Sequence, residues 1–199
     1  MSSLLETVMQ QLGGSGLSGI AKQIGAGEKE TSAASGAAVT TLLSALARNS
    51  KNESGAAALQ GALERDHDGG LLDDLPAFLK NPEIGKGDGI LGHVLGSKRP
   101  VVERSLAKAS GLDAGQSGKL LATLAPLVMG ALGKQQRQRG LDASSLAQFL
   151  GGEQQEIERK QPGSGGILSA LLDGDGDGDV DVADLAKAGK GLLGRFLGR

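Results

Sequence analysis

Six aspartates in the C-terminal part of the sequence have the spacing of a calcium-binding loop. They stand at positions 1, 3, 5, 7, 9 and 12 of a twelve-residue segment, and Gly178 occupies position 6, where such a loop turns sharply. Position 7 offers its backbone carbonyl, and position 9 acts through a water. Oxygen ligands favour calcium over transition metals. The spacing therefore predicts a Ca²⁺ site with the ligands Asp173, Asp175, Asp177, Asp179, Asp181 and Asp184.

The last position of this loop is Asp184, where calmodulin-like loops carry a longer glutamate. The segment is similar to EF-hand loops, and more similar to dockerin-type loops, which commonly end in aspartate. An alternative interpretation is a disordered acidic tract, because neighbouring carboxylates repel and frequent glycine opposes ordering. That alternative does not explain the glycine at position 6 or the apolar Val180 at position 8.

A second acidic segment matches the calcium pattern less well. Glu64, Asp66 and Asp68 fit positions 1, 3 and 5, but Leu75 falls at position 12 and cannot bind a cation. A turn punctuated by glycine is the favoured interpretation, and binding of an ion by Asp66 and Asp68 is left open.

Evidence for catalysis or nucleotide binding is weak. His67 and His93 lie in separate segments, and we expect each to be structural or exposed rather than a general base. No serine lies in a G-x-S-x-G elbow. The glycine-rich segments 14–19 and 87–92 fit G-x-G-x-x-G, but no strand is predicted before either. The sequence therefore predicts a protein that is not an enzyme.

Composition limits the remaining functions. The 199 residues include 34 glycines, three phenylalanines, no tryptophan, no tyrosine and no cysteine, so the core must be aliphatic and thiol chemistry is excluded. The net charge of −2 makes nucleic-acid binding unfavourable. No apolar run is long enough to span a bilayer, and no signal peptide is visible. We expect a cytoplasmic location, with non-classical export left open.

Helical periodicity dominates the sequence, and no segment alternates as a strand does. Pro126 falls inside the longest apolar helix and should kink or split it. The motif Gly-Leu-Asp-Ala occurs at 111–114 and 140–143, where it predicts the end of one helix and the capped start of the next. Helices are expected over about 1–12, 17–24, 28–48, 54–65, 71–79, 101–109 and 113–134, with a short helix or turn at 87–96.

These patterns divide the chain into an all-α domain over 1–150, a polar linker over 151–164 and an EF-hand-like hairpin over 165–199. The hairpin would end in a basic amphipathic helix that could contact a membrane surface. Ala33, Ala37 and Ala38 form a face of small side chains in the first domain, and we expect this face to support self-association.

Four segments of the first domain resemble the bacterial DUF937 or YidB-like family. They read LERDHDGGLLDD over 63–74, GDGILGHVLG over 87–96, SGLD over 110–113 and LAPLVMGALG over 124–133. The resemblance covers about residues 1–150 and implies a compact helical fold. It implies no activity and no catalytic residues.

The sequence thus favours a non-enzymatic, calcium-binding structural or protein-interaction protein. One alternative is a regulatory or nucleic-acid-associated helical protein. Another is a membrane-surface protein that acts through its C-terminal helix.

Overall fold

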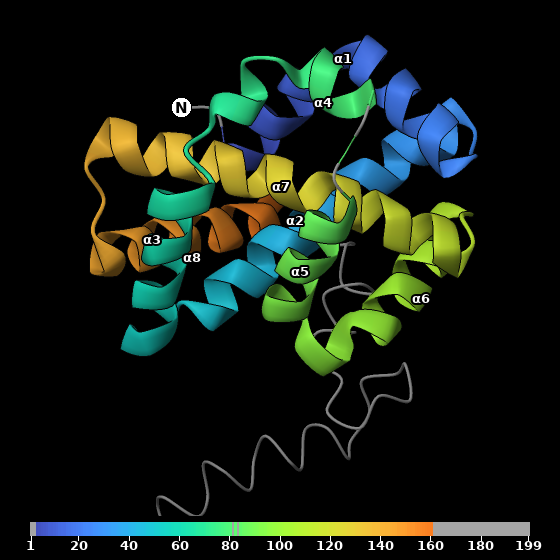
Figure 1. Ribbon diagram of the computed structural model, residues 1–199. Coiled ribbons are helices and arrows are strands. Elements are labelled where there is room, and N and C mark those ends of the chain that lie inside the picture. The colour runs from blue at the N-terminus through green and yellow to red at the C-terminus, as the bar shows by residue number, and fades with distance from the viewer. Residues whose placement is uncertain (1–2, 81, 83, 161–199) are drawn as a thin grey trace, which may run out of the picture.

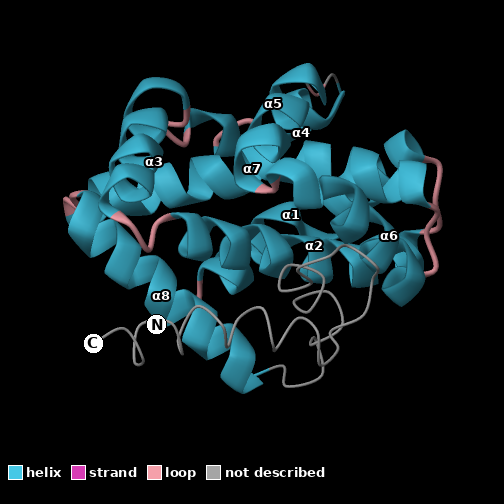
Figure 2. Cartoon of the chain, turned by 90° about the horizontal axis from the view of Figure 1, so that it is seen from below, coloured by secondary structure: helices cyan, strands magenta, loops and turns pink. Residues whose placement is uncertain are grey.

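Several helix ends lie at capping residues, among them Ser3, Asn52, Asp113 and Gly140. The computed structural model describes residues 3–80, 82 and 84–160. Within this part of the chain all regular structure is helical, which confirms the all-α class (Figure 1, Figure 2). The elements are α1 (Leu4–Ile24), α2 (Glu28–Asn49), α3 (Glu53–Asp66), η1 (Gly70–Leu72), α4 (Leu75–Lys80), α5 (Ile84–Val94), η2 (Gly96–Lys98), α6 (Arg99–Ser110), α7 (Ala114–Arg139) and α8 (Ala143–Lys160).

The repeated Gly-Leu-Asp-Ala motif ends and starts helices as predicted. Gly111 and Gly140 end α6 and α7 with φ of 77° and 62°, a left-handed conformation that glycine adopts without steric cost. Asp113 and Asp142 each accept a hydrogen bond from the backbone N–H three residues later, at 2.7 and 2.8 Å. Helix α1, in turn, is interrupted at Gly13, where the sequence predicts a break.

Helix α7 is the central element and contacts α1, α2, α3, α5 and α6. The Leu124 side chain of α7 has no exposed surface and lies in the core. Helix α8 packs on α2 and α3, and α4 lies beside α1 (Figure 1). None of the helices described has the length and apolar character needed to cross a membrane.

Of the two outcomes expected for Pro126, a kink or a split, the split does not occur, because α7 runs through the proline as one helix. Proline lacks an N–H, so the carbonyl of Ala122 loses its donor within the helix. Gly87 of α5 lies against this carbonyl, so closely that a Cβ at Gly87 would overlap the oxygen. A Cα–H group can make a weak hydrogen bond to such an oxygen. Packing on all sides keeps α7 continuous, and α5 covers the defect.

The segment after Gly151 differs from the linker expected over 151–164, because α8 continues as a packed helix to Lys160. Ile157 is buried, and Glu153 is 8% exposed. The Oε2 atom of Glu153 accepts a hydrogen bond of 2.7 Å from the backbone N–H of Leu4. The polar segment 151–160 is therefore part of a helix rather than a linker, because a few of its side chains pack on the core.

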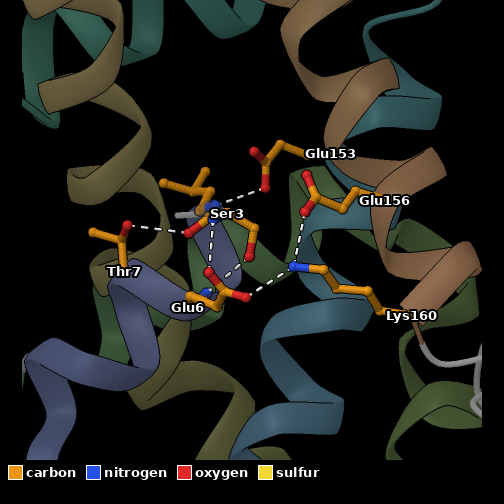
Figure 3. A network of polar contacts seen from close by, with 7 residues as sticks. Ser3, Glu6, Thr7, Glu153, Glu156 and Lys160 are labelled. Carbon is orange, nitrogen blue, oxygen red and sulfur yellow. Dashed lines mark hydrogen bonds and ion pairs between the residues drawn. The ribbon is translucent and has the colours of Figure 1, made fainter. Parts of the chain in front are cut away.

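Charged side chains also join the end of α8 to the start of α1 (Figure 3). Lys160 Nζ donates to Glu6 Oε1 at 2.9 Å and lies 2.8 Å from Glu156 Oε1. These bonds and the Lys160 charge lower the pKa of both glutamates. The two ends of the described domain are therefore held side by side.

The face of small side chains on α2 packs partly within the chain. Ala38 is fully buried, Ala37 is half-buried and Ala33 is exposed. The buried part of this face is therefore used in packing α2 inside the domain.

Candidate functional site

A groove of about 1230 Å³ lies between α3 and α5. Both helices pack on α7, and they run beside each other on the same side of the molecule (Figure 1). We refer to this hollow as the α3–α5 groove.

The floor of the groove is apolar. Leu46 of α2, Met129 of α7 and Val94 of α5 form it, and each of these side chains is almost completely buried in the domain. Leu59 and Ile90 are half-buried and extend the apolar surface up the two walls. An apolar ligand surface would therefore be shielded from water at the bottom of the groove.

Each wall is one face of a helix. Gly55, Ala58, Leu59 and Ala62 recur at three- and four-residue intervals on α3, and Lys86, Gly89, Ile90 and His93 do so on α5. Three of the four α3 residues, and Gly89 of α5, have a small side chain or none. The helix backbones are therefore accessible from inside the groove.

Charged and titratable side chains lie along the rim. Arg65 and Asp66 form an ion pair of 3.9 Å, and their side chains are 70% and 65% exposed. Burial lowers the pKa of His67 below its ordinary value, the nearby Asp66 raises it and Lys86 lowers it. His93 is exposed on the opposite wall. The fold thus brings together the two histidines that the sequence places in separate segments.

Two polar side chains at the end of the groove have structural roles. Asn49 Nδ2 donates to the carbonyl oxygen of Val94 at 2.9 Å, which ties α2 to the end of α5. Asn52 caps α3 by accepting a hydrogen bond of 2.7 Å from the N–H of Gly55. These bonds fix the position of both walls at this end.

The second acidic segment forms a turn. Asp68 accepts a hydrogen bond of 2.9 Å from the N–H of Gly70 and lies 3.8 Å from Arg137. Glu64 accepts a hydrogen bond from Gln60 along α3. In the described ranges, no cluster of three acidic or histidine side chains could hold a metal ion. The hydrogen bond between Asp68 and Gly70 is the turn that the sequence favours for this segment.

The six aspartates of the predicted calcium loop lie outside the described residues, as do the predicted C-terminal hairpin and the basic helix. Two glycine-rich segments that mimic phosphate loops lie inside helices, 14–19 in α1 and 87–92 in α5. Among the described residues no strand precedes either segment, so neither has the strand–loop–helix context of a phosphate-binding loop.

The groove itself was not predicted from the sequence. Its walls come from two helices that are separated by η1 and α4, and its floor comes from α2, α7 and the end of α5. The sequence offers one signal, because the apolar Ile90 stands between Gly89 and Gly92, whose lack of a side chain leaves room beside it. Hydropathy alone cannot show which two helix faces will stand opposite each other.

The family model DUF937, described as a bacterial protein of unknown function, matches residues 6–135. No curated protein and no solved structure matches the chain. The matched residues contain both walls and the floor of the α3–α5 groove, whereas the predicted calcium loop lies beyond them.

Proposed function

We propose that this chain, which belongs to the DUF937 family, is a non-enzymatic interaction protein that binds a partner in the α3–α5 groove. The observation that carries the proposal is the groove of about 1230 Å³ with an apolar floor. Apolar surface that a domain leaves open is a common mark of a binding site.

Binding is favoured over catalysis by the chemistry of the rim. A general base needs a partner that orients it and a pKa near the working pH. Asp66, the carboxylate that acts on His67, is itself paired with Arg65. Burial lowers the pKa of His67, so this histidine is a weaker base than usual. The polar groups around the groove are therefore suited to recognising a partner.

A pair of matched variants tests this proposal. Gly89 and Gly92 are both exposed on α5, and a Cβ at either position would meet no atom within 4 Å. Gly89 lines the groove and Gly92 does not. We expect the side chain of Gly89→Leu to project into the groove and to abolish recovery of crosslinked partners from cells, while Gly92→Leu recovers them as the unchanged protein does. If the two variants behave alike, the groove is not the binding site.

Calcium binding by the loop at 173–184 is a second proposed function, supported by the spacing of its aspartates. The shorter Asp184 in the last position suggests a modest dissociation constant of about 10⁻⁵–10⁻³ M. Calorimetry should show that Asp177→Ala abolishes calcium binding. Asp179→Ala should have little effect, because position 7 binds through its backbone carbonyl. Equal losses in the two variants would mean that the loop register is wrong.

A further inference from the structure

We infer that the α3–α5 groove receives an amphipathic helix whose polar edges carry acidic residues. This inference rests on the proposed function and names the kind of partner. A groove of about 1230 Å³ exceeds the roughly 300–1000 Å³ that is usual for small-molecule pockets. Its open form and apolar floor match an elongated ligand with one apolar face.

The length and walls of the groove fit a helix. The lining residues run from Ser54 to Asp66 on α3, which is about 18 Å of helix at 1.5 Å per residue. On α5 they run from Lys86 to Val94, about 12 Å. A third helix of two to three turns can therefore contact both walls along its length.

Small residues on the walls allow close approach of such a helix. Ala58 and Ala62 on α3 face the groove beside the larger Leu59, and Gly89 on α5 stands beside Ile90. A Cβ at Gly89 would meet nothing within 4 Å, so space remains next to its backbone. This alternation provides holes for apolar side chains at the helical spacing i, i+3, i+4 and i+7.

The charge of the rim selects an acidic partner. Arg65 and Lys86 stand on opposite walls, and Asp66 is the acidic side chain among the lining residues. The Arg65 side chain is 70% exposed and its ion pair with Asp66 is long, so it can turn toward a carboxylate of the partner. His93 on the α5 wall can donate a further hydrogen bond.

Two model peptides test this inference. Each has about 14 residues, or about 21 Å of helix, with leucine at helical spacing. One peptide carries glutamate at the remaining positions, and the other carries lysine. Binding to the full chain would be measured by fluorescence anisotropy at low and high salt, and backbone NMR shifts of α3 and α5 would locate it.

We expect the glutamate peptide to bind about tenfold more tightly than the lysine peptide at low salt. Gly89→Leu should abolish this binding and Gly92→Leu should retain it. Arg65→Glu should weaken binding of the glutamate peptide and strengthen binding of the lysine peptide, because it reverses one charge on the rim. Equal binding of both peptides, or no shift in α3 and α5, would overturn the inference. If cellular partners still depend on Gly89 when neither peptide binds, the proposed function stands and only the helical acidic partner is wrong.

Discussion

Replacing Gly87 by alanine should destabilise the domain, although alanine is the better helix former. Gly87 lies on the face of α5 that contacts α7, and a Cβ there would overlap the carbonyl oxygen of Ala122. The Ala122 carbonyl belongs to the backbone, so it cannot rotate away from a new Cβ as a side chain could. Helix α5 would therefore have to move off α7, and the apolar contacts between the two helices would be lost.

The expected magnitude is the difference between two opposing effects. Glycine to alanine in a helix interior gains about 0.5–1 kcal/mol. Adding a methyl group to a well-packed contact costs about 1–3 kcal/mol of stability. The cost at Gly87 should be at the upper end of this range, because the new Cβ would meet backbone atoms. The net loss is therefore about 2 kcal/mol. In a domain of this size, each kcal/mol lowers the melting temperature by about 2–4 °C, so we expect a decrease of about 4–8 °C.

The assay is thermal unfolding of the full chain, followed by circular dichroism in the far ultraviolet. Gly89→Ala is the matched control, because Gly89 lies on the same helix and a Cβ there would meet no atom within 4 Å. The control should melt slightly above the unchanged protein. If Gly87→Ala also melts at or above the unchanged protein, the close contact between α5 and α7 is refuted.

Three further variants test the core, a cap and a buried carboxyl. Leu124→Asp should unfold the domain, because an unpaired carboxylate at this fully buried site costs several kcal/mol; a cooperative melt at the original temperature would contradict this. Asp142→Ala should lower the midpoint of urea unfolding, because the Ser145 N–H at the start of α8 loses its acceptor. Burial raises the pKa of Glu153 above its ordinary value of 4.5, so stability is lost as pH rises through the folded-state pKa. Glu153→Gln still offers an acceptor to the Leu4 N–H, so its melting temperature relative to the unchanged protein should rise from about pH 4 to pH 7.

Helix boundaries could be predicted because their causes are local. Ser3 caps α1, Gly111 ends α6 and Asp113 caps α7, and each acts within a few residues of its own position. The end of α8 could not be predicted in this way. Its second half is polar, and it is ordered by the burial of Ile157 and by the bond between Glu153 and the distant Leu4.

The effect of Pro126 also depends on a residue that is distant in the sequence. A proline inside a helix predicts a kink or an end when only that helix is considered. The sequence does not show that Gly87, 39 positions earlier, will cover the carbonyl that proline leaves without a donor. Likewise, His67 and His93 meet at one groove only because α3 and α5 both pack on α7.

The width of the α3–α5 groove is set by glycines at the contacts with α7. On one side, Gly87 allows α5 to approach the Ala122 carbonyl. On the other side, a Cβ at Gly133 of α7 would overlap the carbonyl oxygen of His67, directly after α3. A side chain at Gly87 or Gly133 would push the neighbouring wall of the groove away from α7. A ligand held between the walls would then no longer contact the floor. These glycines therefore shape the proposed binding site without touching a partner, since they determine where both walls stand.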